Sequence, residues 1–127
     1  MVLVDSSLWI AESRGVLTLN QQTGRELHAV CPPIVQEVLQ GARTAKLEKG
    51  FRDTLGAAHM LENPMPLELF EEAARLFRTC QDAGITPGFA DALIAVCAIR
   101  NRVPLLTLDS DFQRIAAIVP LRLFTRS

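Results

Sequence analysis

Short apolar runs alternate with segments of helical periodicity along this 127-residue chain, and this alternation most constrains its fold. We expect strands at residues 2–4, 27–31, 58–65, 103–108 and 121–124, the third of them weak because Asn63-Pro64 interrupts it. Apolar spacing predicts helices at residues 6–15, within 16–27, and at 34–42, 44–55, 69–80, 87–101 and 112–117. Such alternation is typical of a parallel sheet covered on both faces. We therefore predict an α/β fold, a single three-layer α/β/α sandwich over residues 1–127 with a mainly parallel central sheet.

The composition excludes several classes of protein. No stretch reaches the roughly 18 apolar residues of a membrane span, and Met1 leads directly into a predicted strand, so we expect a soluble cytoplasmic domain with no membrane partner. The cysteines and histidines match no zinc or disulfide spacing, which predicts buried, reduced thiols. The net charge of −1 argues against a uniformly basic nucleic-acid binder, although a cluster of carboxylates can mask a basic face.

Four acidic residues stand where a predicted strand or helix meets a loop. Asp5 ends the first apolar run and Asp109 ends the run at 103–108, so both lie at carboxyl ends of predicted strands, where ligands bind in parallel sheets. Glu37 and Asp91 lie in the early turns of two predicted helices. Carboxylates beside apolar residues are costly to desolvate, and clustered carboxylates repel one another unless a cation neutralises them.

These acids predict a site for a hard divalent cation. Such ions prefer carboxylate oxygens, and Mg²⁺, with Mn²⁺ as an alternative, would bind through Asp5, Asp91 and Asp109. Glu37 would complete the ligand set or orient the attacking water of a phosphodiester hydrolysis, in which one or two ions would operate. Clustering would also raise carboxylate pKa values in the metal-free protein and make metal affinity depend on pH.

Each acid also has a structural interpretation. Asp5 could cap a helix, Asp91 and Glu37 could lie on solvated helix faces, and Asp109 with Asp111 could form a turn. Each signal is weak alone, and only the joint placement favours a site.

Four blocks of the sequence resemble those of PIN-domain nucleases. They are VDSSLWI at 4–10, PIVQEVLQG at 33–41, DALIA at 91–95 and LTLDSDF at 106–112, and they occur in the order of that family. The small size is similar to that of the VapC toxins of toxin–antitoxin pairs. The resemblance implies a Mg²⁺-dependent endoribonuclease that cleaves structured RNA, a transfer RNA or a ribosomal RNA loop, as the toxin of a type II pair. It also implies a homodimer and a cognate VapB-type antitoxin whose tail reaches the acidic site.

The resemblance assigns roles residue by residue. Asp5, Glu37, Asp91 and Asp109 correspond to the catalytic acids, while Asp111 is an addition or an alternative to Asp109. Hydroxyls of Ser6, Ser7 and Thr107 would support the site. Many relatives carry Ser or Arg just before the third acid, and this chain has TPGFA at 86–90 instead, a difference that concerns substrate contacts.

A stripe of basic residues is the candidate RNA-binding surface. The three-residue spacing of its members would place phosphate-binding cations along one helix, although acids interleave with them, and a solvated face is the alternative. Its members are Arg43, Lys46, Lys49 and Arg52, with Arg14 and Arg25 as weaker candidates.

Two rival protein classes can be excluded from the sequence. A response-regulator receiver needs a lysine after its last core strand, but every Lys or Arg position beyond Lys49 is Arg. A haloacid-dehalogenase-like phosphatase needs Asp-x-Asp, whereas the first strand is followed by Asp5-Ser6-Ser7. The remaining alternative is a catalytically silent PIN-like module that binds RNA or a protein.

Overall fold

The computed structural model describes residues 1–125, in which four parallel strands form one sheet. The strand order is β3-β2-β1-β4, with bounds β1 Val2–Val4, β2 His28–Val30, β3 His59–Met60 and β4 Leu105–Leu106. Leu3, in the middle of β1, pairs with Ala29 of β2 and with Leu105 of β4. The predicted α/β fold class is thus confirmed, with a sheet that is wholly parallel.

The predicted strand at 121–124 is wrong as a full strand. Only a single parallel bridge forms there, between Leu105 and Leu123, supported by hydrogen bonds from Leu105 N to Arg122 O and from Phe124 N to Leu105 O. The predicted strand at 103–108 is likewise reduced to two residues. Pro104 lies within the segment 103–108, directly before β4, and Pro120 precedes the segment 121–124, and a proline has no N–H with which to extend a ladder.

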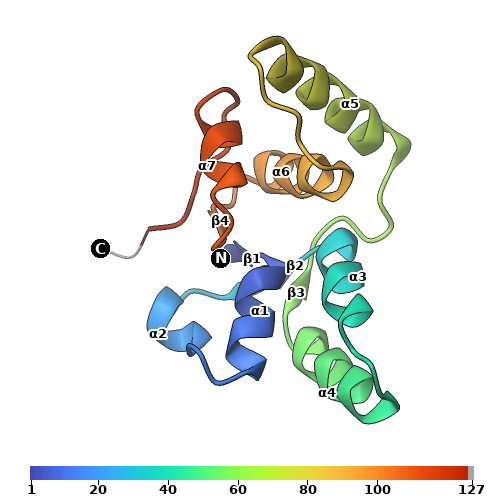
Figure 1. The fold of residues 1–127 in the computed structure, drawn as a ribbon, viewed down its shortest axis with the longest axis vertical. Coiled ribbons are helices and arrows are strands. Elements are labelled where there is room, and N and C mark those ends of the chain that lie inside the picture. The colour runs from blue at the N-terminus through green and yellow to red at the C-terminus, as the bar shows by residue number, and fades with distance from the viewer. Residues whose placement is uncertain (126–127) are drawn as a thin grey trace.

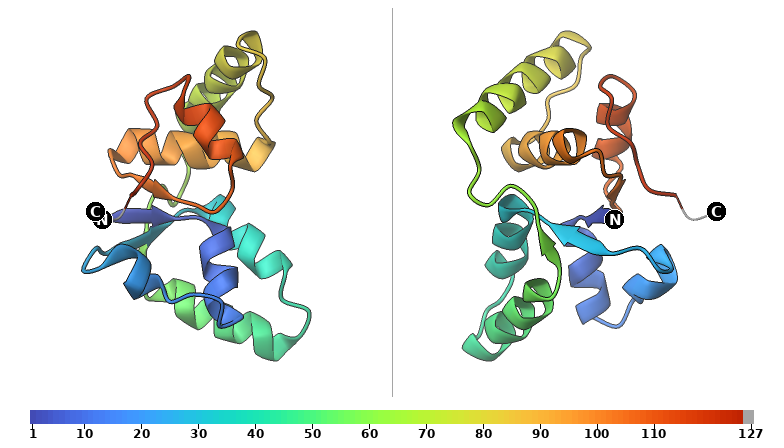
Figure 2. Two further views of the ribbon diagram at one scale, coloured as in Figure 1. Left: turned by 60° about the vertical axis from the view of Figure 1, so that its left-hand side comes forward. Right: turned by 180° about the vertical axis from the view of Figure 1, so that it is seen from behind.

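In the described residues, seven helices cover the two faces of this sheet. They are α1 Ser6–Ser13, α2 Leu19–Thr23, α3 Pro32–Gln40, α4 Ala45–Gly56, α5 Leu67–Asp82, α6 Phe89–Asn101 and α7 Asp111–Ala116. Helices α1 to α4 lie on one side of the strands and α5 to α7 on the other, which gives the three layers (Figures 1 and 2). Within residues 1–125, no helix is both long enough and apolar enough to cross a bilayer.

The core lies around β1 and α6. All three residues of β1 are fully buried, as expected for a central strand with helices on both faces. Helix α6 is buried continuously from Ala92 to Ala98, and a helix that is apolar nearly all round belongs in the interior. Asp91 immediately precedes this stretch, so the position of its carboxylate is fixed by the packing of the core.

The order of the strands creates a switch point beside β1. The chain places β2 and then β3 on one side of β1, and after α5 and α6 it returns to place β4 on the other side. Connections leave β1 and β4 toward opposite faces of the sheet, and ligands of parallel sheets bind in the crevice that opens there. Asp5 and the segment 107–111 both follow the carboxyl ends of these strands.

Ion pairs of Arg100 hold both the connection between β3 and α5 and α5 itself against α6. The Nε atom of Arg100 lies 2.9 Å from Glu62 Oε1, and its Nη1 atom lies 3.0 Å from Glu72 Oε1. The side chain of Asn101 also donates to Glu62 Oε1, at 3.2 Å. These contacts fasten the crossing segment to the helix that carries Asp91.

Candidate active site

Asp5 is a buried carboxylate that is fully supplied with hydrogen-bond donors. It follows β1, caps the N-terminus of α1 and is only 4 % exposed. Its Oδ1 atom accepts from the backbone N–H of Ser6 at 2.8 Å, and its Oδ2 atom accepts from the hydroxyl of Thr107 at 2.7 Å. The hydroxyls of Ser6 and Ser7 donate to it at 3.5 and 3.4 Å. The capping interpretation of Asp5 is therefore correct, and it coexists with a place in the acidic site.

Two hydroxyls tie the loop after β4 to Asp5. Thr107 Oγ1 donates to Asp5 and accepts the backbone N–H of Asp109 at 3.0 Å. Ser7 Oγ likewise donates to Asp5 and accepts the N–H of Leu108 at 3.2 Å. A hydroxyl can do both because it carries one proton and two lone pairs. The donated protons fix the orientation of Asp5, and the accepted bonds fix the backbone that carries Asp109.

Glu37 reaches the same edge from α3. Its Oε1 atom lies 3.3 Å from the hydroxyl of Ser6, which is also near Asp5. The hydroxyl has one proton, so it donates to only one of the two carboxylates at a time. Glu37 is half-buried, which leaves its other oxygen available to a ligand.

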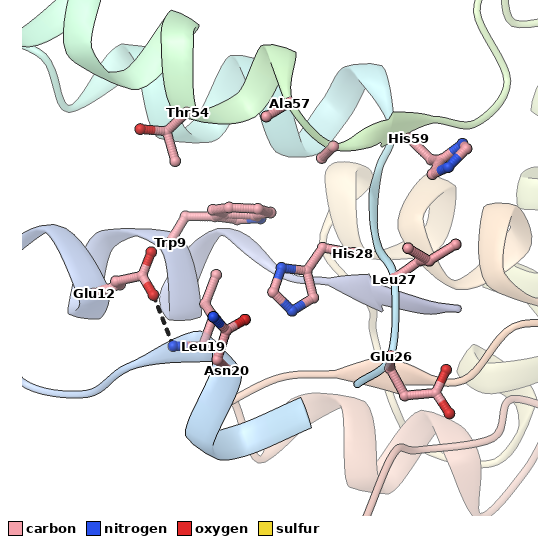
Figure 3. A pocket seen from close by; sticks show the side chains of 11 residues that line it. Trp9, Glu12, Leu19, Asn20, Glu26, Leu27, His28, Thr54, Ala57 and His59 are labelled. Carbon is pink, nitrogen blue, oxygen red and sulfur yellow. Dashed lines mark hydrogen bonds between the residues drawn. The ribbon is translucent and has the colours of Figure 1, made fainter. Parts of the chain in front are cut away.

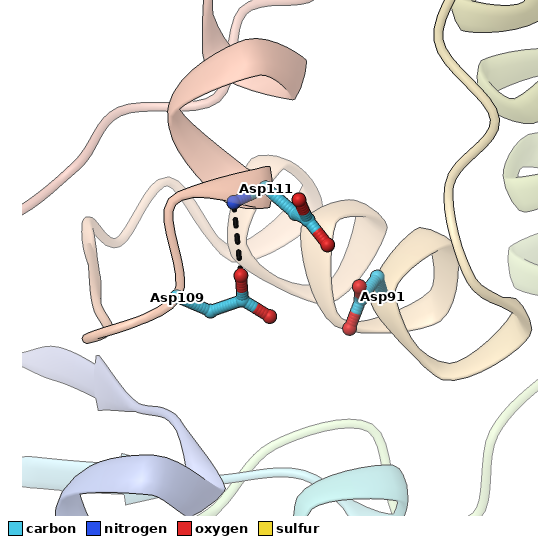
Figure 4. Close-up of side chains that lie close together, drawn as sticks. All are labelled: Asp91, Asp109 and Asp111. Atoms are coloured by element: carbon cyan, nitrogen blue, oxygen red, sulfur yellow. Dashed lines mark hydrogen bonds between the residues drawn. The ribbon is translucent and has the colours of Figure 1, made fainter.

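Three further carboxylates converge most closely. Asp91, Asp109 and Asp111 each place one oxygen so that all three atoms lie within 4.8 Å of one another (Figure 4). Asp91 comes from the first turn of α6, while Asp111 N–H donates to Asp109 Oδ1 at 2.9 Å and so folds the loop before α7. Asp111, which the sequence left as an addition or an alternative to Asp109, lies beside it. The closest trio thus contains Asp111, whereas the predicted metal ligands were Asp5, Asp91 and Asp109.

The acids at this edge are partly desolvated and raise one another's pKa values. Burial, reinforced by the charges of Asp5 and Asp109, raises the pKa of Asp91 to about 6. Burial is also the main cause that raises the pKa of Asp5 and of Glu37, with nearby carboxylates adding to it. Among residues 1–125, the only ion pair to these acids is that of Arg114 with Asp111, at 2.9 Å. A set of hard oxygen donors that repel one another suits Mg²⁺ or Mn²⁺.

Away from the acidic edge, a hollow of about 420 Å³ lies on the side of the sheet covered by α1, α2 and α4 (Figure 3). Its wall includes Trp9, which is 5 % exposed and donates its indole N–H to Val4 O at 2.9 Å, so Trp9 is a core residue and not a platform for bases. The hollow contains none of the acids that converge after β1 and β4. The hollow is lined by the titratable residues Glu12, Glu26, His28 and His59, but the described residues show a convergent carboxylate cluster only at the acidic edge, which is therefore the better candidate for phosphodiester chemistry.

The predicted basic stripe lies on the exposed surface of α4 and just before it. Its residues are exposed, and Lys49 is paired with Asp53 at 2.8 Å. Residues three apart on a helix are rotated by about 300° about its axis. Each basic residue of α4 is therefore displaced by about 60° from the previous one, and the stripe winds around the helix. Helix α4 and α7, which lies beside the acids, are on opposite sides of the sheet (Figures 1 and 2). Arg14 is at the far end of α1 from Asp5, about 12 Å along an eight-residue helix.

Arg114 is the cation that the sequence analysis missed. The interval from Asp111 to Arg114 is three residues, the spacing at which side chains meet on a helix. That signal was present in the sequence, but it depends on a helix that begins at Asp111.

Comparison with known proteins agrees with this geometry. The model of the family described as "PIN domain" matches residues 2–118. Ribonuclease VapC11 of Mycobacterium tuberculosis is 29 % identical over 130 residues, covering 96 % of each chain, and Ribonuclease VapC of Rickettsia bellii is 30 % identical over 131 residues, covering 95 % of this chain and 98 % of its own.

Two solved structures share the fold. VapBC2 from Rickettsia felis, bound to a DNA fragment from its promoter, superposes with a TM-score of 0.75 at 17 % identity and 98 % coverage of both chains. VapC20 of Mycobacterium tuberculosis, a sarcin–ricin loop cleaving toxin, superposes with a TM-score of 0.69 at 14 % identity, covering 96 % of this chain and 99 % of its own. The resemblance found in the sequence is confirmed: this chain belongs to the PIN-domain family and, within it, to the VapC ribonucleases.

Proposed function

We propose that this protein is a Mg²⁺-dependent endoribonuclease that cleaves structured RNA, a transfer RNA or a ribosomal RNA loop, as the toxin of a type II toxin–antitoxin pair. The observation that carries the proposal is the convergence of Asp91, Asp109 and Asp111 beside the carboxyl ends of β1 and β4, with Asp5 and Glu37 behind them. Mn²⁺ is an alternative ion, because it shares the preference for oxygen ligands.

The acids would divide the work of holding the ion and the water. Asp91, Asp109 and Asp111 offer the closest oxygens. Asp5 can join them, because two of its four donors are serine hydroxyls at 3.4 and 3.5 Å that can rotate away. A bound Mg²⁺ would activate a water and stabilise the leaving oxygen of the phosphodiester. Glu37, through the oxygen that Ser6 does not contact, would orient that water and accept its proton, a role that its raised pKa favours.

The relatives support the choice of substrate and partners. VapC20 is a toxin that cleaves the sarcin–ricin loop, and a toxin–antitoxin complex from Klebsiella pneumoniae shares the fold with a TM-score of 0.74 at 20 % identity. We therefore propose a cognate VapB-type antitoxin as the partner of this chain.

A second copy of the chain is the other proposed partner. Phe89 is 80 % exposed and Leu67 75 %, and together with Phe70 they leave an apolar face along α5 and the start of α6. Exposed apolar surface of this kind is typical of protein interfaces. This face supports a homodimer.

The direct test is cleavage of total transfer RNA and ribosomal RNA by antitoxin-free protein. We expect a discrete cut with Mg²⁺ or Mn²⁺ that is lost with EDTA and in Asp91→Asn, but retained in Asp82→Asn, a matched change at an exposed aspartate of α5. Fragment ends would identify the target. A folded, metal-loaded wild type that cuts neither RNA pool would contradict the proposal and favour a binding module.

A further inference from the structure

A hollow of about 460 Å³ adjoins the acidic site on the side of α7. It lies between α7 and the turn that joins α5 to α6, and it shares the Asp111 side chain with the trio of carboxylates. Its volume is within the range of roughly 300–1,000 Å³ that small-ligand sites occupy. The residues that line it are Gly84, Ile85, Thr86, Pro87, Asp111, Arg114 and Ile115.

Of the described residues that line this hollow, Arg114 is the one that is cationic. Its Nη1 atom donates to Asp111 Oδ1 at 2.9 Å, and its side chain is 63 % exposed. An exposed pair three residues apart on a helix contributes little to stability, so the guanidinium can leave Asp111 at small cost. It then presents a planar fork of donors whose geometry matches a phosphate.

The negative charge of the acidic site makes a cationic side chain beside it useful for binding RNA. RNA brings a phosphate on each side of the one that is cut, and five carboxylates at the acidic edge repel them. A divalent ion bound by Asp111 would neutralise the carboxylate that holds Arg114 and leave the guanidinium free for another anion. Thr86, exposed on the opposite wall, offers a hydroxyl to the same anion. It belongs to the segment 86–90 in which this sequence departs from the family pattern.

We propose that Arg114, with Thr86 across the hollow, binds a backbone phosphate of the RNA next to the scissile one, exchanging Asp111 for that phosphate. The proposal rests on the proposed ribonuclease function and adds a substrate contact to it. It places the phosphate contact beside the acids, on the opposite side of the sheet from the basic stripe of α4.

The test is RNA binding by a protein that cannot cut. Fluorescence anisotropy with end-labelled, unfractionated transfer RNA would compare Asp91→Asn with the double variant Asp91→Asn/Arg114→Gln over a range of salt concentrations. Loss of a charge-assisted phosphate contact should weaken binding about tenfold and reduce the slope of log Kd against log salt by about 0.7–0.9. Arg114→Lys should recover the slope but only part of the affinity, because an ammonium lacks the fork.

Arg75→Gln is the matched control, because Arg75 is an exposed arginine on α5 and its loss changes the net charge equally. Equal losses in Arg75→Gln and Arg114→Gln would overturn the subsite, since the effect would then be one of net charge. So would a lowered urea midpoint in Arg114→Gln with an unchanged salt slope, which is the result of a purely structural ion pair. If the wild type is active and Arg114→Gln has the same KM and the same RNA affinity, the subsite is overturned but the proposed function stands. If the wild type neither binds nor cuts RNA, the proposed function is overturned together with the subsite.

Discussion

Replacing Asp91 with Asn should stabilise the metal-free protein while abolishing its activity. The carboxylate of Asp91 is partly desolvated and faces Asp5 and Asp109, and these surroundings raise its pKa from 3.8 to about 6. A carboxyl that holds its proton more tightly in the folded chain than in the unfolded chain destabilises the fold once the pH ionises it. Asparagine keeps the shape of the side chain and removes the charge.

The magnitude follows from the two pKa values. A pKa about two units above its ordinary value corresponds to about 3 kcal/mol in the free energy of unfolding, which is an upper bound. Asp91 is only half-buried, so solvent screening reduces this to about 1–2 kcal/mol. The Asp91 carboxylate also interacts favourably with the N-terminus of α6, by about 0.3–1 kcal/mol, and this interaction is lost in the Asn variant. We therefore expect Asp91→Asn to be more stable by about 1 kcal/mol.

The sign of the effect depends on pH. Well below pH 3.8 the carboxyl is protonated in both states, and wild type and variant should be equally stable in this respect. Between pH 4 and 6 the unfolded chain ionises first, so the stability of the wild type falls as the pH rises. Above pH 6 the difference is complete. Urea denaturation in EDTA at pH 4.5 and 7.5, followed by the fluorescence of the single, buried tryptophan, Trp9, would measure it.

Adding Mg²⁺ at pH 7.5 should reverse the order. An ion at 100 times its Kd stabilises the wild type by about 2.7 kcal/mol, and a variant that lacks a ligand gains less. Asp82→Asn should show neither effect, because Asp82 is exposed on α5. An Asp91→Asn variant less stable than wild type at pH 7.5 in EDTA would refute the reasoning, since Asp91 would then stabilise the fold through contacts and not strain it through charge.

Three further predictions concern the hydrogen bond of Thr107 to Asp5, the ion pairs of Arg100, and the pH dependence of metal affinity. Thr107→Val removes the proton donated to Asp5 and should lower the free energy of unfolding by about 1–3 kcal/mol and slow cleavage, whereas Thr107→Ser should retain both. Arg100→Leu should lower the urea midpoint, while Lys49→Ala, which breaks an exposed pair, should change the free energy of unfolding by less than about 0.5 kcal/mol. Mg²⁺ affinity measured by titration calorimetry should fall about fourfold from pH 7.5 to 5.5, because protons compete for Asp91.

The sequence predicted the layers of the fold because they depend on apolar periodicity. The continuous apolar run of β1 predicts a strand buried on both faces, and the helical apolar stripe of α5 predicts a helix buried on one face. The lengths of the outer strands were less predictable. A strand at the edge of the sheet is limited by what pairs with it, and β4 meets only a single bridge at Leu123.

The sequence indicated which acids lie at this edge of the sheet, but not how they group. Strand ends brought Asp5 and Asp109 to one edge by a general property of parallel sheets. The hydroxyl of Thr107 and the turn from Asp109 to Asp111 decide which oxygens meet, and these depend on side-chain contacts within a few ångströms. No periodicity in the sequence encodes such contacts.

The position of Arg114, outside the buried acids, suits a site that binds a divalent ion reversibly, as proposed above. A buried arginine among the acids would have relieved their repulsion permanently, and removing it to admit a metal would leave an unpaired buried charge. Arg114 instead stands outside, exposed on the short helix α7, and it neutralises only Asp111. The buried Asp5 and the half-buried Asp91 have pKa values raised mainly by burial and further by the neighbouring carboxylates, and no cation lies between them to lower these pKa values within residues 1–125. A divalent ion bound as we propose would relieve the repulsion that remains, so the raised pKa values of the acids and the proposed affinity for metal would have the same physical origin.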